Sequence, residues 1–453
     1  MKSLTFTKII VMTVKPLHIL LLALVVFAQT SFAQTFNKAK MDSLFDAIAA
    51  NNRAMLSIAL TQKGQVVYSR AIGNSWLGEK NIPANTQTKY RVGSISKMFT
   101  AVMIFQMIEE GKLKLTTPLS QFYPTLPNAS KITIAQLLSH SSGLHSFTSD
   151  STYTTWLNKK MTPAEMIAKI NVKPDFEPGS KHQYSNSNFI LLGYIIEKLD
   201  KKPYAVVLKN RITGKTGLNN TYYGGKITAA NNEAYSYYWK DKWLPDTETD
   251  MSIPGGAGAL VSNPTDLVKF MNALFGGKLV AAASLTQMHT IKDGYGMNLF
   301  AFPFDGHTAY GHGGDIDGFR SQAAYFPADD IAVAYTANGV NTSLNNVMIG
   351  VLSIAFNKPY TIPNFKPVAL SAQELDQYTG VYSSTQMPLK VNINKNETTL
   401  TAQATGQSAF SLDAAGNHTF KFDGAGITLI FDPANGQMTL KQGGGTYLFT
   451  KAK

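Results

Sequence analysis

The hydrophobic and polar positions of this chain change their spacing several times, as expected of a protein that mixes helices and strands. Residues 41–50 carry apolar side chains along one face, which predicts an amphipathic helix. Strand-like runs follow over 56–61 and 66–71, separated by a short polar turn. Residues 94–111 are apolar nearly all round and end at Gly111, so we expect a buried helix there.

The same mixture continues to about residue 357. Residues 112–250 indicate short helices separated by polar loops. A helix is predicted over 264–275, strands over 321–326 and 331–335, and a last helix over 345–356. No internal repeat or low-complexity tract interrupts these elements.

The pattern changes after a proline-containing stretch at 358–369, which is predicted to be a linker. Beyond it, short runs recur at regular spacing and are separated by turn signals such as Asn435-Gly436. They predict a small antiparallel β domain, a barrel or a sandwich. Its expected strands cover 389–393, 410–412, 419–422, 427–431, 437–440 and 447–450. The predicted organisation is an N-terminal segment at 1–33, a domain at 34–357, the linker at 358–369 and the β domain at 370–453.

The N-terminal segment has the order of a secretory signal peptide. Lys2, Lys8 and Lys15 precede an apolar run at 19–28, and small residues stand shortly before Gln34. We expect cleavage after residue 33 and an exported protein, periplasmic or secreted. The alternative is an uncleaved anchor, but this run is about half of the roughly 20 apolar residues that a bilayer requires. After cleavage, no stable membrane span is expected.

Composition narrows the chemistry. Of 453 residues, 44% are hydrophobic and 15% charged, which is enough apolar surface for a core. The absence of cysteine excludes disulfides, thiolate metal sites and a cysteine nucleophile. The net charge of +12 is scattered without a Lys/Arg run, so nucleic-acid binding is not expected. His140 and His145 have no carboxylate pattern beside them, so we expect neither a metal nor another cofactor.

Ser94 and Lys97 form the first candidate catalytic motif. Their three-residue spacing places both side chains on one helix face. A serine needs a base within hydrogen-bond reach to act as a nucleophile, and a lysine whose pKa is lowered by burial can be that base. The Ser-x-x-Lys pattern occurs once in the chain and opens the predicted buried helix. It therefore predicts a serine nucleophile, Ser94, with Lys97 as its base.

Tyr184-Ser185-Asn186 forms the second motif, before an apolar helical run over 189–196. A tyrosine beside a lysine ammonium is expected to have a lowered pKa, so Tyr184 can carry protons. The Asn186 amide can donate to a substrate carbonyl. The alternative, which is compatible with the first, is that Ser185 or Asn186 caps the helix.

His312-Gly313-Gly314-Asp315 forms the third motif and directly precedes a predicted strand pair. The two glycines allow a substrate backbone to lie close against an edge strand. The backbone N–H of Asp315, with that of Ser94, is a candidate oxyanion hole. Because histidine titrates near neutrality, we expect a substrate carboxylate to raise the pKa of His312 and to bind its imidazolium.

These three motifs, in this order, resemble those of serine β-lactamases and penicillin-binding proteins. The tyrosine motif is similar to that of the class C β-lactamase, DD-peptidase and esterase branch. The resemblance covers residues 40–357 and includes segments at 137–144, 177–179 and 255–258. It implies an α+β fold with a mixed antiparallel sheet flanked by helices and a helical lobe, with the site between them. The C-terminal β domain resembles a lipocalin-like module.

The third motif departs from the family pattern, because His312 stands where most β-lactamases have lysine. A literal Lys215-Thr216-Gly217 also occurs, but it lies only about thirty residues beyond Tyr184, in a loop after a helix, so we reject it.

The resemblance implies an acyl-transfer enzyme. Ser94 attacks a carbonyl while Lys97 and Tyr184 take its proton, and Tyr184 with Lys97 later activates water. Expected substrates are small molecules or peptides, including D-amino-acid peptides of the cell wall, small esters or amides, and β-lactams. His312 and the extra β domain favour a peptidase or esterase over a dedicated β-lactamase. A different class of function, a binding or scaffold protein that keeps the fold without turnover, is the alternative.

Overall fold

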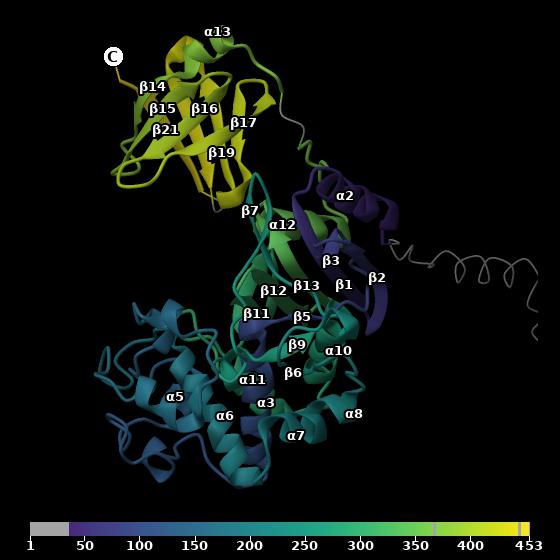
Figure 1. The fold of residues 1–453 in the computed structure, drawn as a ribbon, viewed down its shortest axis with the longest axis vertical. Helices are drawn as coiled ribbons and strands as arrows, with labels where there is room; N and C mark the ends of the chain where they lie inside the picture. The colour runs from purple at the N-terminus through teal and green to yellow at the C-terminus, as the bar shows by residue number, and fades with distance from the viewer. Residues whose placement is uncertain (1–35, 366–367, 443–444, 453) are drawn as a thin grey trace, which may run out of the picture.

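A computed structural model describes residues 36–365, 368–442 and 445–452. The predicted signal peptide at 1–33 lies outside the described residues. Figure 1 shows a β barrel at one end, a sheet with its helices in the middle and a helical lobe at the other end. The α+β class is confirmed, and the C-terminal domain is a closed barrel. No helix among the described residues is long and apolar enough to cross a membrane.

The main sheet is antiparallel along its principal strands. Its strand order is β10-β11-β12-β13-β1-β2, and a β7–β8 hairpin joins through β13. The bounds are β1 (Ala54–Gln62), β2 (Gln65–Ile72), β7 (Tyr237–Lys240), β8 (Lys242–Pro245), β10 (Phe300–Phe304), β11 (His307–Ile316), β12 (Phe319–Phe326) and β13 (Ile331–Val340). Two small sheets pair β3 (Asn74–Trp76) with β4 (Ile82–Pro83), and β9 (Leu260–Ser262) with β5 (Tyr90–Arg91) and β6 (Tyr222–Tyr223).

Helices cover both faces of the sheet, because its central strands alternate apolar side chains between two cores. From β1, Leu56, Ile58 and Leu60 pack with α2 (Lys38–Ala50) and α12 (Leu344–Ala355). Ala59 points to the opposite core, which contains α3 (Ser96–Glu109) and α10 (Pro264–Phe275). The remaining helices are α4 (Ile134–Leu138), α5 (Pro163–Ile170), α6 (Asn186–Asp200), α7 (Tyr204–Leu208), α8 (Gly214–Thr216), α9 (Gly255–Gly258), α11 (Ala282–His289) and α13 (Ala372–Leu375).

The helix predicted over 94–111 begins as a 3-10 turn, Gly93–Ile95, and continues as α3. Its residues from Ser96 to Met107 are all buried, which explains why no polar face appears in the sequence. Gly111 lies just beyond the helix and has a φ of +73°. This left-handed conformation is the one that favours glycine after a helix C-terminus.

The barrel contains eight strands around its own apolar core. They are β14 (Gly380–Ser383), β15 (Lys390–Asn396), β16 (Thr399–Ala404), β17 (Phe410–Gly416), β18 (Thr419–Phe422), β19 (Ile427–Asp432), β20 (Gln437–Gln442) and β21 (Gly445–Lys451). The sequence predicted all but β14 and β16. β14 has four residues, and β16 buries only Leu400 and Ala402, so neither has a strong apolar signal.

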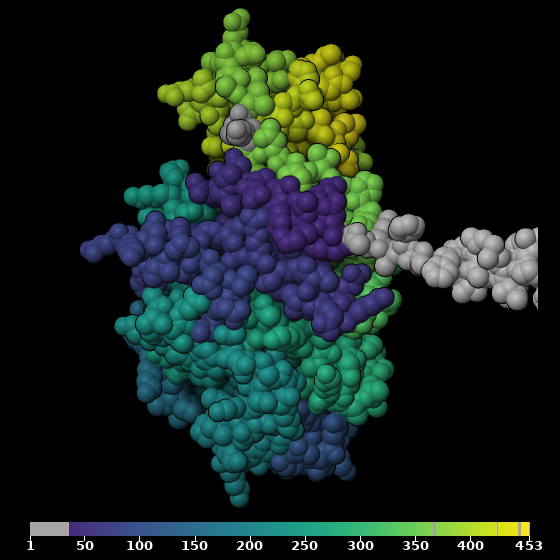
Figure 2. Space-filling model, turned by 90° about the vertical axis from the view of Figure 1, so that its right-hand side faces the viewer, coloured from purple at the N-terminus to yellow at the C-terminus, as the bar shows by residue number. Residues whose placement is uncertain are grey.

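The barrel contacts the N-terminal part of the larger domain, residues 36–357, as the space-filling view shows (Figure 2). Arg53 ion-pairs with Asp413 at 3.5 Å and with Asp423 at 3.9 Å, both in the barrel. It also donates to the Phe365 carbonyl at 3.1 Å. Arg53 therefore joins the larger domain, the connecting segment and the barrel.

The first part of the predicted linker packs against the larger domain. Tyr360, Ile362 and Phe365 are partly buried on the core that holds α2 and α12. A Cβ atom on Gly350 of α12 would lie 2.5 Å from the Tyr360 ring, so this glycine makes room for it. The described residues of 358–369 contain no helix or strand.

We expect a chain that ends at residue 365 to fold and stay soluble without the barrel. A chain that ends at residue 357 loses the partial burial of Tyr360, Ile362 and Phe365, which contributes roughly 2–4 kcal/mol. Its thermal midpoint should therefore be lower by several degrees. Thermal unfolding of the two truncated chains measures the difference. Insolubility of the longer truncated chain would show that the barrel completes the core of the larger domain.

Candidate active site

Ser94 lies in the tight turn that precedes α3, and two close backbone approaches hold this turn against β11. Gly93 has a φ of +49°, and a Cβ atom there would lie 2.8 Å from the Asp315 nitrogen. A Cβ atom on Gly314 would lie 2.0 Å from the Val92 carbonyl oxygen. We expected the glycines of β11 to make room for a substrate backbone. At Gly314 the close neighbour is instead the protein's own chain.

Lys97 is completely buried, and its amino group has three neighbours. Nζ lies 2.8 Å from Ser94 Oγ, 2.8 Å from Asn186 Oδ1 and 2.7 Å from the Ala257 carbonyl oxygen. Burial holds the pKa of Lys97 well below its usual range. A neutral amine has two N–H groups and one lone pair. Since Asn186 Oδ1 and the Ala257 carbonyl only accept, they take both N–H groups, and the lone pair faces the Ser94 hydroxyl.

Tyr184 lies against Lys97, with the Lys97 amino group 4.9 Å from the centre of its ring. Burial raises the pKa of Tyr184 well above its usual value of 10, and the nearby Ser94 hydroxyl lowers this pKa only in part. The expected lowering is therefore reversed, because burial penalises the phenolate. In the described part of the chain, the Tyr184 hydroxyl has no hydrogen-bond partner. Tyr184 is a buried neutral phenol with a proton to give.

Asn186 fixes Lys97 from the start of α6. Its Oδ1 accepts from Lys97, and its Nδ2 donates to Thr148 Oγ1 at 3.0 Å. One N–H of the amide remains for a substrate carbonyl. Ser185 occupies the N-cap position, but its side chain makes no capping hydrogen bond. The helix-cap interpretation of this motif is therefore correct for the backbone position but not for the side chain.

His312 is buried beside the nucleophile and is neutral. Its Nδ1 is in short contact with the Gly313 carbonyl oxygen, which assigns the ring proton to Nδ1. Burial lowers the pKa of His312 to about 3. Its Nε2 therefore carries a lone pair, and this atom has no partner among the described residues. This burial moves the pKa of His312 away from neutrality in the protein without substrate.

Two further groups of the site were not singled out in the sequence. The His140 ring stacks on Tyr184 with 4.3 Å between ring centres, and its Nδ1 accepts from the Ser185 N–H. The only signal for His140 was its place in the segment at 137–144 that resembles the family. The second group is the Ala257 carbonyl of α9. It reaches Lys97 because α9 packs closely on α6 where two glycines meet, and a Cβ atom on Gly256 would lie only 3.0 Å from the Gly193 Cα.

The backbone of Asp315 also faces the nucleophile. β11 and β12 are joined by a two-residue turn, and in such hairpins the flanking residues, here Ile316 and Phe319, are expected to form a hydrogen-bonded pair. Because these pairs alternate along an antiparallel ladder, the next pair, Asp315 and Arg320, is a non-hydrogen-bonded one. The Asp315 N–H therefore points away from β12 and toward the turn that holds Ser94. The Asp315 carboxylate ion-pairs with Arg320 at 2.8 Å.

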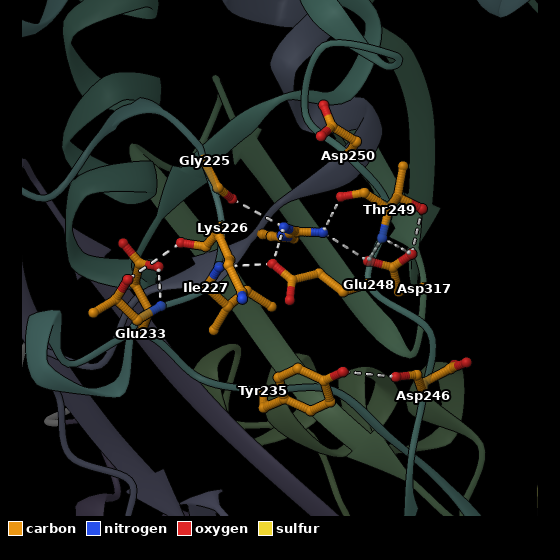
Figure 3. Close-up of polar contacts among 12 residues, drawn as sticks. Gly225, Lys226, Ile227, Glu233, Tyr235, Asp246, Glu248, Thr249, Asp250 and Asp317 are labelled. Carbon is orange, nitrogen blue, oxygen red and sulfur yellow. Dashed lines mark hydrogen bonds and ion pairs between the residues drawn. The ribbon is translucent and has the colours of Figure 1, made fainter. Parts of the chain in front are cut away.

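A buried arginine, Arg91, joins the turn after β11 to the strand before Ser94. Figure 3 shows the residues that accept its hydrogen bonds, Asp317, Glu248, Thr249 and Gly225. Arg91 donates to Asp317 Oδ2 at 2.9 Å, to Glu248 Oε1 at 2.9 Å and to the carbonyls of Thr249 and Gly225. Asp317 in turn accepts from the Thr249 side chain and N–H. Since β5 leads directly to Ser94, this network fixes the distance between the nucleophile and β11.

All the residues predicted for the site lie together. Ser94 is shared by two cavities, one of about 750 Å³ and one of about 460 Å³. The larger is lined by Ser94, Tyr184, His312, Gly313, Gly314 and Asp315, among others. The smaller is lined by Ser94, Asn186, Phe147, Tyr153, Asp246 and Asp317, among others. No group of side chains in the described residues is arranged to hold a metal ion.

The fold and the arrangement around Ser94 define a serine hydrolase with the architecture of β-lactamases and penicillin-binding proteins. The family model described as Beta-lactamase matches residues 41–349, and the chain belongs to this family.

Relatives extend this comparison. A penicillin-binding protein of Bacillus subtilis is 25% identical over 376 residues, which cover 77% of this chain and 82% of the relative. The teichoic acid D-alanine hydrolase of Staphylococcus aureus is 26% identical over 220 residues, 48% of this chain and 53% of that protein. The D-amino acid amidase of Ochrobactrum anthropi superposes with a TM-score of 0.63 and 25% identity over 71% of this chain and 99% of its own.

Arg91→Met should lower the free energy of unfolding by about 3–5 kcal/mol, because it leaves the Asp317 carboxylate buried without its cation. Adding Asp317→Asn should restore part of this loss, since asparagine tolerates the φ of +51° at this position. Chemical denaturation of both single variants and the double variant measures the coupling. Strictly additive losses would show that the ion pair contributes nothing of its own.

Proposed function

We propose that this protein hydrolyses D-aminoacyl esters and amides through an acyl-enzyme on Ser94. The observation that carries the proposal is the buried Lys97 amine, whose lone pair faces the Ser94 hydroxyl at 2.8 Å. This arrangement supplies the base that a serine nucleophile requires.

In the first step, Ser94 Oγ attacks the substrate carbonyl carbon and passes its proton to Lys97. The N–H groups of Ser94 and Asp315 stabilise the oxyanion. Tyr184 gives its proton to the leaving oxygen or nitrogen, the bond to the carbonyl breaks, and Lys97 returns a proton to Tyr184. In the second step, water attacks the acyl-enzyme, its proton passes to Lys97, and Ser94 regains a proton as the acid leaves.

The smaller cavity supports a short acyl group with an amine. Asn186 offers an N–H for the acyl part, and Phe147 and Tyr153 give apolar walls. Asp246 adds a carboxylate to the lining of this cavity, which suits an ammonium group, whereas the charge of Asp317 is balanced by Arg91. Two similar proteins, a teichoic acid D-alanine hydrolase and a D-amino acid amidase, are named for the same kind of acyl group.

The neutral His312 supports a donor on the substrate rather than a carboxylate, because its free Nε2 accepts hydrogen bonds. For this reason we favour D-aminoacyl esters and amides as substrates over peptides that end in a carboxylate and over β-lactams. The predicted signal peptide supports an exported enzyme, periplasmic or secreted, that meets such acyl groups at the cell envelope.

Ser94→Ala should abolish turnover and covalent labelling while the fold survives. Incubation with a fluorophosphonate, followed by mass spectrometry of peptides, should place the adduct on Ser94. Ser185→Ala is the matched control, because Ser185 lies beside Tyr184 and its hydroxyl is also buried. An adduct on Ser141 or Ser185 would overturn the assignment, and no adduct at all would favour a binding protein without turnover.

The pH dependence of kcat/KM should have one acid limb. Because the base must be neutral, activity is present above the lowered pKa of Lys97 and is lost as the pH falls through it. Tyr184 keeps its proton to above pH 10, and His312, with a pKa of about 3, remains neutral. The rate is therefore expected to be level from neutrality to about pH 9. An alkaline limb near neutrality that vanishes in His312→Gln would refute the neutral imidazole.

Tyr184→Phe should affect amides far more than activated esters. An amine leaves only after it gains a proton, whereas p-nitrophenolate leaves without one, so the loss should be about 10²–10⁴-fold for a D-aminoacyl amide and much smaller for the p-nitrophenyl ester. Lys97→Ala serves as the comparison, because it should slow both substrates alike. Equal losses on both substrates in Tyr184→Phe would assign Tyr184 to attack by Ser94 rather than to departure of the leaving group.

A further inference from the structure

The two cavities at Ser94 divide the substrate between them. Asn186 lines the smaller cavity and not the larger, whereas Tyr184 and His312 line the larger. In the proposed function, Tyr184 protonates the leaving group, so the leaving group lies in the larger cavity. The acyl group then occupies the smaller one.

The larger cavity is an extended groove. It begins at Ser94, crosses β12 and β13 past Ser321 and Val340, and reaches the start of α12. Ser321 pairs with Thr336 across the sheet, and Val340 lies four residues further along β13. At about 3.3 Å per residue, this part of the groove alone is about 13 Å long. A leaving group the size of ammonia or one amino acid fills only its first part.

The barrel closes the far end of this groove. Ala425, from the turn Asp423–Ala425 between β18 and β19, lines the same cavity as Ser94. Gly426, at the end of the turn, has a φ of +63°, and a Cβ atom there would lie 3.2 Å from Ser343 Oγ at the start of α12. This turn is therefore seated directly on the hydrolase domain.

An ion pair holds the turn in place. Arg53 and Asp423 are largely buried, with 13% and 17% of their side chains exposed, and lie 3.9 Å apart. Separating them would leave two poorly hydrated charges, which is more costly than breaking an exposed pair. The position of Ala425 is thus determined by the domain interface and not only by the barrel.

We propose that the turn Asp423–Ala425 is the distal wall of the leaving-group site, and that the substrate is a short acyl group attached to an extended chain. This chain reaches about four peptide residues, or an equivalent length of another polymer, from the scissile bond. The barrel is then a specificity element of the enzyme. The inference rests on the proposed function, because the direction of the substrate follows from the role of Tyr184.

The test compares two series of substrates in the full chain. In the first, D-alanine is joined through its carboxyl group to one to five glycines ending in an amide, so that the leaving group lengthens. In the second, one to five glycines precede D-alanine p-nitroanilide, so that the acyl side lengthens. The value of kcat/KM should rise about tenfold up to four glycines in the first series, as a few added contacts allow, and should not rise in the second.

Ala425→Trp should remove most of the gain with length, because the larger ring fills the distal groove. Ala434→Trp is the matched control: it lies exposed in the turn Pro433–Asn435, which also ends in a left-handed glycine but joins the next pair of strands. This control should keep the gain.

Labelling of Ser94 by p-nitrophenyl acetate distinguishes a failure of the proposed function from a failure of the inference about the groove. If Ser94 is never acylated, the proposed function is wrong and the inference falls with it. If Ser94 is acylated, the inference alone is overturned by any of three results: no cleavage of the first series, no gain with length in it, or a full gain in Ala425→Trp. A gain only in the second series would place the acyl chain in the groove and would also overturn it.

Discussion

The burial of one amine without a carboxylate partner is the constraint on which the site depends. Lys97 is fully buried in α3, and within the described chain its amino group contacts a hydroxyl, an amide oxygen and a backbone carbonyl. A protonated lysine is costly in such surroundings, so the fold favours the neutral form. The apolar surroundings of α3 are therefore part of the chemistry, because they keep the base unprotonated.

Backbone groups supply much of what this constraint requires. The Ala257 carbonyl takes one N–H of Lys97, and it reaches that position only because α9 and α6 approach at Gly256 and Gly193. The contact between the Ser94 turn and β11 likewise depends on Gly93 and on positions where a Cβ atom does not fit. A side chain at any of these glycines would move a catalytic group without touching the substrate.

The sequence was sufficient to predict the residues whose role depends on spacing along one helix or one turn. Ser94 and Lys97 are one helical turn apart, and the structure places them in contact as expected. It was insufficient where the role depends on burial. The expected lowering of the Tyr184 pKa was wrong, because segments distant in the chain bury this ring. Burial also lowers the pKa of His312 in the protein without substrate, whereas its charge beside a bound carboxylate stays a prediction.

Separation along the chain also limits how far sequence patterns can predict the contacts between domains. The regular spacing of short strands predicted a separate β domain, and the closed barrel has its own core. Nothing in that pattern placed Asp423 beside Arg53, some 370 positions earlier, because both are ordinary surface residues in a sequence. Contacts between domains leave no local periodicity to detect.

The place of one short turn has a consequence for protein engineering. Provided that Asp423 is kept for its ion pair with Arg53, the loop between β18 and β19 can be varied at little cost to folding, since its ends are already held together by the ladders on either side. Here such a loop borders the same cavity as the nucleophile, yet it belongs to a different core from the catalytic helix. Libraries confined to the remaining positions of this hairpin would therefore diversify the far end of the cavity while leaving the reactive centre, and the packing that creates it, unmutated.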